Sequence, residues 1–409
     1  MTLPLSSHAR NTSVRIIVSK NLVQIIDDIP VFGEPVDAAA LEQIKNAKKL
    51  ADKVALLADH HLGFGVPIGG VVAYRDHVSP SGVGYDIGCG NKAVRIDVPA
   101  RKVKAQIHRI MDEVAKKISF GLAQKNQEEV DHPLFDDKAW KEIPVLKRTY
   151  DKARNQLGTV GGGNHYVDIF VDEADQVWIG VHFGSRGLGH TIATEYIEVS
   201  RMKGQEADGI ATLYARSDAG EEYLEAMRIG GEYAYAGRDW VCGRVAKICG
   251  GKIVEEVHNH HNYCWRETHC GVDYWVVRKG ATPAFPGQMG FVGGSMAEPA
   301  VILQGVEHPL SEHTLYSTVH GAGRVMSRRA AKGDKKKGIQ GRVTPHAMQR
   351  AMQDANVVLR GGDVDESMHV YKRLPEVLAH HAGTIEIVHT LTPLGVAMAG
   401  SDVFDPYRD

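Results

Sequence analysis

The sequence lacks the features that would assign it to a membrane, to a secretory route or to a broadly cationic nucleic-acid-binding class. No apolar run reaches the roughly 18 residues that a membrane-spanning helix needs. Residues 1–15 are polar and lack the apolar core of a secretory signal. Charge is balanced, with 48 basic and 50 acidic side chains and a net charge of −2, so no global field recruits the chain to RNA or lipid. We therefore expect neither a membrane protein nor a secreted one.

Cysteine is scarce and several standard motifs are absent. The five cysteines are an odd number without a regular framework, which indicates a reducing compartment and predicts a cytoplasmic protein. The chain has no P-loop, no His-Glu-x-x-His and no Lys-x-Asp-Gly, the last being the site of adenylation in ATP-dependent ligases. It also has no linker-like stretch and no internal repeat, so we predict one domain over residues 1–409.

Glycine and histidine are plentiful. The 44 glycines are about 11% of the chain, against a usual share of about 7%. There are 21 histidines but only 14 tyrosines and 9 phenylalanines. Many glycines suggest backbone brought close to a partner, and many histidines suggest metal or proton chemistry.

Hydrophobic periodicity predicts an α+β fold. Apolar residues at helical spacing predict helices over 41–57, 103–118 and 219–248. The segments 165–171 and 176–183 read as a hairpin of two strands around a polar turn, and residues 273–277 and 384–390 are further strand candidates. Helices and strands without regular alternation favour α+β over a doubly wound sheet.

Five segments contain residues that could bind a metal or an anion. Asp86 and Cys89 stand three apart between glycines, where a thiolate could bridge two metal ions; the alternative is a small buried cysteine in a tight turn. Glycines precede His165, and His182 leads into a glycine-rich turn with Arg186. If the hairpin forms, the two histidines lie close together, as metal ligands would, while an arginine suits a phosphate. A glycine turn before a strand, however, needs no ligand.

Two further histidine segments are candidates. Residues 258–261 contain three histidines, and since adjacent residues on a strand face opposite sides, we expect only one of His260 and His261 to coordinate. His320 precedes Gly-Ala-Gly, which leaves room for a bulky group beside its ring, although a loop histidine beside a solvated charge run is the alternative. The window 324–337 is the most basic of the chain.

Taken together, these segments resemble the RtcB family of RNA ligases. Seven segments match the family's motifs in the same order, namely residues 58–63, 84–90, 163–165, 182–187, 261–262, 278–281 and 320–324. The resemblance implies a single large RtcB-type α+β domain, with mixed sheets surrounded by helices and a central dinuclear metal cleft.

The resemblance also implies a ligand set and a nucleophile. Asp86 and His165 would bind one Mn²⁺, His182 and His261 would bind a second, and Cys89 would be shared. Ligand softness alone would suggest zinc, so manganese is implied by the family only. His320 would attack the α-phosphorus of GTP and form a histidyl-guanylate, which a neutral imidazole can do near pH 7.

The implied reaction joins two RNA ends. The guanylate would pass to an RNA 3′-phosphate, formed where necessary from a 2′,3′-cyclic phosphate, to give RNA-3′-pp-5′-G, and a 5′-hydroxyl would then displace GMP. The positions that match RNA-phosphate contacts are Arg186, Lys279, Arg324 and Arg328. Those assigned to the guanylate pocket are Asn164, His165, Tyr166, Val167, Asp168, His261, Asn262, Gly293, Gly294, Ser295, Met296, His320, Gly321, Ala322, Gly323 and Tyr371.

The sequence departs from the family pattern in the nucleotide pocket. Asp168 stands where the family has Glu, Gly293 replaces a proline, Ala300 replaces a serine, and no lysine stands near the C-terminus. Two other functions remain open. Asp59-His60-His61 matches the short signature of DHH phosphoesterases and suggests a dinuclear RNA-end phosphodiesterase or phosphatase without ligation. A non-catalytic RNA-binding paralogue using the 324–337 window is the third hypothesis.

Overall fold

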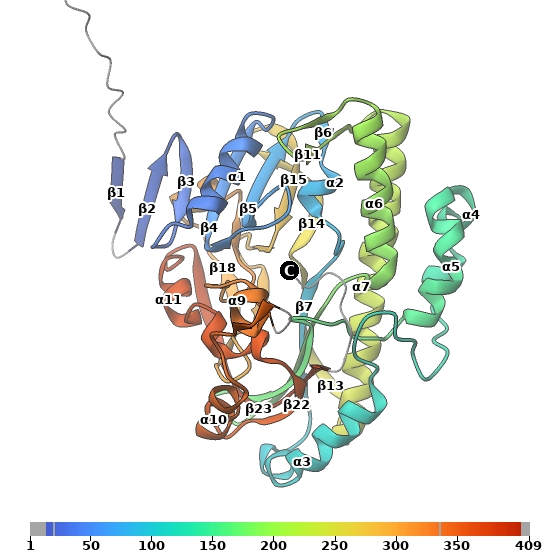
Figure 1. Cartoon of the computed structure of the whole chain (residues 1–409), viewed down its shortest axis with the longest axis vertical. Helices are drawn as coiled ribbons and strands as arrows, with labels where there is room; N and C mark the ends of the chain where they lie inside the picture. Colours follow the sequence, from blue (N-terminus) through green and yellow to red (C-terminus); the bar gives the residue numbers. More distant parts are fainter. Residues whose placement is uncertain (1–13, 19–20, 335–336, 402–409) are drawn as a thin grey trace, which may run out of the picture.

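The computed structural model describes residues 14–18, 21–334 and 337–401 and has two large sheets flanked by helices (Figure 1). The seven-stranded sheet has the order β1-β2-β3-β4-β5-β15-β14. The eight-stranded sheet has the order β13-β7-β9-β8-β23-β18-β17, with β22 paired in parallel with β23. The α+β prediction is confirmed.

The strands of the large sheets and the short pairs have the following bounds. The seven-stranded sheet consists of β1 (Val14–Val18), β2 (Asn21–Ile26), β3 (Ile29–Phe32), β4 (Lys53–His61), β5 (Ile68–Tyr74), β15 (Val272–Lys279) and β14 (Asn262–His269). The eight-stranded sheet consists of β13 (Ile253–His260), β7 (Gly90–Ile96), β9 (Val177–Phe183), β8 (Tyr166–Val171), β23 (Ile385–Gly400), β18 (Ala300–Gly305), β17 (Met289–Val292) and β22 (Val358–Gly362). Short pairs are β6 (His77–Val78) with β12 (Leu213–Tyr214), β10 (Glu206–Ala207) with β11 (Ile210–Ala211), β16 (Ala281–Pro283) with β19 (Ser317–Val319), and β20 (Gly333–Asp334) with β21 (Ile339–Gln340).

The helices connect and cover these sheets. The α-helices are α1 (Ala38–Lys48), α2 (Pro80–Val83), α3 (Ala100–Lys117), α4 (Ala139–Glu142), α5 (Pro144–Gln156), α6 (Arg186–Met202), α7 (Asp218–Cys249), α8 (Pro309–His313), α9 (Arg328–Lys332), α10 (Pro345–Asp354) and α11 (Leu374–Ala379). Short 3₁₀ turns are η1 (Pro133–Asp136), η3 (Val364–Glu366) and η4 (Met368–Val370). No helix within these described ranges is long and apolar enough to cross a membrane.

Most of the predicted elements form. The predicted helices over 103–118 and 219–248 are α3 and α7, and the predicted hairpin is the antiparallel pair of β8 and β9. The Ser217 side chain caps the start of α7 by accepting from the Gly220 N–H, and Gly250, at φ 77°, ends the helix in the left-handed conformation that glycine favours. Residues 273–277 lie in β15, and 384–390 belong mainly to β23, which continues to Gly400.

The helix predicted over residues 41–57 is wrong in its second half. Helix α1 ends at Lys48, and residues 53–61 form β4 instead. Strand β4 is buried on both faces, since Leu56 packs in one hydrophobic cluster and Leu57 in another. The run 54–58 satisfies a helical period by coincidence, because all five of its positions are apolar.

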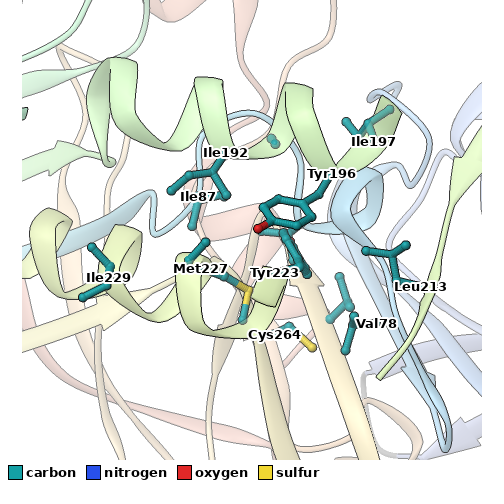
Figure 2. Packing of buried hydrophobic residues seen from close by; sticks show 14 of the residues in the cluster. Val78, Ile87, Ile192, Tyr196, Ile197, Leu213, Tyr223, Met227, Ile229 and Cys264 are labelled. Atoms are coloured by element: carbon teal, nitrogen blue, oxygen red, sulfur yellow. The ribbon is translucent and has the colours of Figure 1, made fainter. Parts of the chain in front are cut away.

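A hydrophobic cluster between α6 and α7 supports the turn that carries Asp86 and Cys89. Helices α6 and α7 lie side by side, and Ile192 and Tyr196 of α6 meet Tyr223 and Met227 of α7 (Figure 2). Ile87 is fully buried in the same cluster. Because the Ile87 side chain is packed against two long helices, the turn is held in place, and with it the positions of Asp86 and Cys89.

His381 makes stability dependent on pH. It follows α11, is fully buried, stacks on Phe32 with ring centroids 4.9 Å apart, and accepts a hydrogen bond of 3.3 Å from the Ala58 N–H. Burial lowers the pKa of His381 from 6.5 to about 4. The unfolded chain therefore binds a proton between these values that the folded chain does not. The contribution of His381 to the free energy of unfolding is full above pH 6.5 and is lost as pH falls towards 4.

We expect His381→Gln to weaken this pH dependence. The fall in the free energy of unfolding between pH 7.5 and pH 5 should be smaller than in the wild type by about 2 kcal/mol, measured by chemical denaturation. The exposed His346 on α10 provides the control, and His346→Gln should leave the fall unchanged. Equal falls in all three proteins would contradict the assignment.

Candidate metal centre and active site

Five candidate ligands converge where the two sheets meet. Asp86 and Cys89 lie in the turn between α2 and β7, His165 directly precedes β8, and His182 lies in β9. His261 is the single residue between β13, the edge of the eight-stranded sheet, and β14, the edge of the seven-stranded sheet. The chain thus passes from one sheet to the other at a candidate ligand.

The ligands form two groups that share one sulfur. One group is Cys89, His182 and His261, and the other is Asp86, Cys89 and His165; within each group the ligand atoms lie within 4.8 Å of one another. The Cys89 Sγ lies 3.7 Å from the Nε2 atoms of both His165 and His182, and His165 Nε2 lies 3.0 Å from Asp86 Oδ2. This geometry suits two cations bridged by a thiolate.

The electrostatics of the cluster favour cations. Burial raises the pKa of the Cys89 thiol, and the charge of Asp86 raises it further. For Asp86 itself, desolvation would raise the pKa, but the hydrogen bond and charge of His165 outweigh it and lower the pKa to about 2. Burial holds the pKa values of His182 and His261 well below 6.5, so both rings are neutral, the form that binds metal. A carboxylate, a thiol and neutral imidazoles fit divalent transition metals.

Asn91 orients one of these ligands and was not predicted from the sequence. Its Oδ1 accepts a hydrogen bond of 2.6 Å from His182 Nδ1, which directs Nε2 towards Cys89. Its Nδ2 donates to the carbonyls of Phe291 and His320. Such contacts commonly fix the tautomer and orientation of a ligating histidine. The position two residues after Cys89, on a strand beginning at Gly90, is the signal that could have identified it.

His320 stands beside the cluster and is held by Asp59. The Asp59 Oδ2 accepts from both the backbone N–H and the Nδ1 of His320, at 3.0 and 2.6 Å. Burial would raise the pKa of the Asp59 carboxyl, but the charge and hydrogen bonds of His320 outweigh it and lower the pKa. When the ring is neutral and Nδ1 donates to Asp59, the lone pair of His320 is on Nε2, and no hydrogen bond of Nε2 is found among the described residues. The rings of His320 and His261 are 4.8 Å apart.

A cavity of about 280 Å³ joins the cluster to His320. It is lined by all five candidate ligands and by every residue assigned to the nucleotide pocket except Val167: Asn164, His165, Tyr166, Asp168, His261, Asn262, Gly293, Gly294, Ser295, Met296, His320, Gly321, Ala322, Gly323 and Tyr371. Val167 points to the opposite face of β8 and packs in the core with Ile169 and Val181. Successive side chains of a strand alternate between faces, so Tyr166 and Asp168 line the cavity and Val167 does not.

Of the four cations assigned to RNA phosphates, only Arg324 lines the cavity. Arg186 is buried and donates to the Gly121 carbonyl at 2.8 Å. Burial lowers the pKa of Lys279 to about 7, and its Nζ donates to the carbonyls of Phe64 and Ser81. Arg328 pairs with Asp365 and Glu366. Arg186, Lys279 and Arg328 are thus engaged by carbonyl or carboxylate oxygens of the chain itself.

The remaining histidine segments divide into different roles. His261 belongs to the ligand cluster, whereas His260 faces Arg238 and the Gly88 carbonyl, so the two neighbours do point to different surroundings. Of residues 59–61, only His61 lines the cavity, and Asp59 is bonded to His320. Asp59 thus holds His320 and is not a member of either candidate ligand group.

Gly184 has no side chain and so leaves space for the carboxylate of Asp86. A Cβ at this position would lie 2.1 Å from Asp86 Oδ1. We expect Gly184→Ala to displace the carboxylate and lower the affinity for the ion in the Asp86 group by about tenfold or more, measured as Mn²⁺ bound at equilibrium. The matched control is Gly243→Ala within α7, where a Cβ meets no atom within 4 Å. Metal binding that falls equally in both variants would contradict a local effect on Asp86.

Comparison with known proteins identifies the family. A family model described as tRNA-splicing ligase RtcB matches residues 40–143 and 136–399. The chain is 31% identical over 395 residues to the RNA-splicing ligase RtcB of Escherichia coli K12, covering 88% of this chain and 94% of the relative. It is 30% identical over 463 residues to the tRNA-splicing ligase RtcB of Archaeoglobus fulgidus, covering 93% of each. The chain belongs to the RtcB family.

Proposed function

We propose that this protein is an RNA ligase that joins a 3′-phosphate or 2′,3′-cyclic phosphate end to a 5′-hydroxyl end, using GTP and two Mn²⁺ ions. Membership of a family whose relatives are named RNA-splicing and tRNA-splicing ligases supports the ligase activity. The observation that best supports this chemistry is the position of His320. It lines the same cavity as the five candidate ligands, and the described residues form no hydrogen bond to its Nε2.

The metal requirement rests on the donor set. Asp86 and His165 would hold one ion, His182 and His261 the other, and Cys89 both. Bound there, two divalent cations would polarise phosphoryl oxygens and stabilise the attacking and leaving oxygens of a displacement at phosphorus. The Cys89 thiol, whose pKa is raised by burial, supports the proposal because a buried thiolate next to a carboxylate requires compensating positive charge.

In the proposed sequence, His320 serves as nucleophile and leaving group. Its Nε2 attacks the α-phosphorus of GTP, a P–N bond forms and pyrophosphate leaves. An oxygen of the RNA 3′-phosphate then attacks the same phosphorus, which gives RNA-3′-pp-5′-G and releases His320. The 5′-hydroxyl attacks the RNA phosphate, loses its proton and displaces GMP, so the phosphodiester forms without net oxidation or reduction.

Asp59 would prepare His320 for both steps. By accepting the proton on Nδ1, it keeps the lone pair on Nε2 and stabilises the positive charge that the ring gains when Nε2 bonds to phosphorus. The fully buried carboxylate has a second oxygen, Oδ1, without a partner in the described chain, so His320 supplies every hydrogen bond that the carboxylate accepts there.

The nucleotide would occupy the part of the cavity lined by Tyr166, Asp168, Met296 and Met398. Burial raises the pKa of Asp168, and its Oδ1 has no partner among the described residues. A neutral carboxylic acid offers one donor and one acceptor, which complements the O6 and N1–H of guanine. Asp168 therefore supports recognition of a base edge despite being one methylene shorter than the family's glutamate.

The central test is labelling with nucleotide. With Mn²⁺ and α-labelled GTP, the protein should acquire acid-labile label, since a P–N bond is labile to acid, and His320→Ala should acquire none. The other three nucleoside triphosphates, tested in parallel, measure the selectivity of the altered pocket.

RNA carrying a cyclic phosphate provides a second measurement. If the protein opened that ring without GTP, and if His320→Ala did so equally well, the hydrolase hypothesis would replace ligation.

A second prediction concerns Asp59. We expect Asp59→Ala to lower the rate of label transfer from GTP by about 100-fold or more, because the ring loses both its orientation and the stabilisation of its charge. Asp59→Asn retains a hydrogen-bond acceptor and should lose less, which separates orientation from charge. Mn²⁺ binding should be unchanged in both variants, since Asp59 is not in the ligand groups. A normal labelling rate in Asp59→Ala would exclude this role.

A further inference from the structure

Arg238 of α7 is a buried cation that contacts the metal-ligand cluster from behind. Its side chain is fully buried, and no ion pair to it is formed within the part of the chain that the structure describes. It donates instead to the carbonyls of Gly88, at 2.9 Å, and Phe183, and to His258 Nε2 at 2.8 Å. Burying a charged guanidinium without a carboxylate partner is unfavourable. The position of Arg238 among carbonyls and imidazoles therefore calls for a structural or functional explanation.

Arg238 contacts three residues that are adjacent in sequence to candidate ligands. Gly88 precedes Cys89, Phe183 follows His182, and His260, whose Nδ1 lies 3.0 Å from Arg238 Nη2, precedes His261. Cys89, His182 and His261 are the members of one ligand group. The three segments come from different strands and turns, and one planar group with several donors reaches all of them.

The other ligand group is not contacted in this way. No hydrogen bond of Arg238 within the described ranges reaches a residue adjacent to Asp86 or His165. Those two ligands contact each other, and Asp86 lies against Gly184. The two halves of the centre therefore depend on different supporting contacts, apart from the shared Cys89.

The surroundings of Arg238 fix its orientation. The Tyr235 ring lies 5.2 Å from the guanidinium carbon and stacks on His260 with centroids 3.9 Å apart. Helix α7 also approaches the ligand turn closely, since a Cβ on Gly88, which has φ 68°, would lie 3.1 Å from the Gly231 Cα. The guanidinium is thus held on a rigid helix at a fixed distance from the turn.

We propose that Arg238 is a positioning residue that assembles the Cys89–His182–His261 half of the metal centre. It acts through the residues next to the ligands and sets the spacing of three backbone segments. The inference rests on the proposed two-ion centre. The inference requires that substitution of Arg238 weaken the binding of one ion more than that of the other. The proposed function alone does not require such a difference.

The test measures the stoichiometry of Mn²⁺ in the full chain. Wild type, dialysed against a fixed low concentration of Mn²⁺, should bind two ions per chain. Arg238→Met should bind one, because the affinity of the His182–His261 half falls by about 10- to 100-fold. Arg238→Lys, which keeps the charge but has a single nitrogen, should lose less affinity and serves also if the methionine variant fails to fold. Electron paramagnetic resonance adds a signature, since loss of one ion converts a broadened coupled spectrum into that of isolated Mn²⁺.

Two comparisons make the result specific. Arg278→Met removes another fully buried arginine, which pairs with Glu267 rather than contacting the ligand turn, and it should retain both ions even if it melts earlier. Combining Arg238→Met with Gly184→Ala should abolish binding of both ions, because the substitutions act on different halves. The inference is overturned if Arg238→Met binds two ions as tightly as wild type, if Arg278→Met loses metal equally, or if the double variant still binds one ion. Absence of Mn²⁺ from the wild type would instead overturn the two-ion centre itself.

Discussion

The sharing of the Cys89 sulfur by two ligand groups is the constraint on which the geometry of the site depends. Each group contains residues from distant parts of the chain, and both must place their donors around one atom. That atom is buried beside a carboxylate, where a negative charge is unfavourable without a cation. The packing of Ile87 between α6 and α7, the hydrogen bond that Asn91 Oδ1 accepts from His182 and the contacts of Arg238 all serve to hold this arrangement.

His320 and the candidate metal ligands are supported by different sheets. Asp59, which holds His320, belongs to β4 of the seven-stranded sheet, whereas His182 belongs to β9 of the eight-stranded sheet. The cavity is lined by strand residues of both sheets, such as His61 of β4 and His182 of β9, as well as by loop residues. Sites built on regular elements keep reacting groups within the narrow distances that displacement at phosphorus requires.

The sequence allowed the ligand types and the hairpin to be predicted, but not the residues that support them. Strand alternation predicts that only one of His260 and His261 coordinates, and the family resemblance, not alternation, selects His261. The same alternation, applied to Tyr166, Val167 and Asp168, would have excluded Val167. Asn91 and Arg238 could not be assigned, because a polar residue within a strand or helix has no local signature of burial. The error over residues 41–57 has a similar origin, since a strand buried on both faces lacks alternation.

The passage of the chain through His261 has a consequence for how the molecule can vary. Because this residue alone separates β13 from β14, an insertion or deletion of one residue there would shift the pairing of both edges and turn their side chains to the wrong faces. The opposite end of β14, at the exposed Cys270 and Gly271, has no such restriction. Differences in length between homologous proteins are therefore compatible with the turn at residues 270–271 and incompatible with the position of His261.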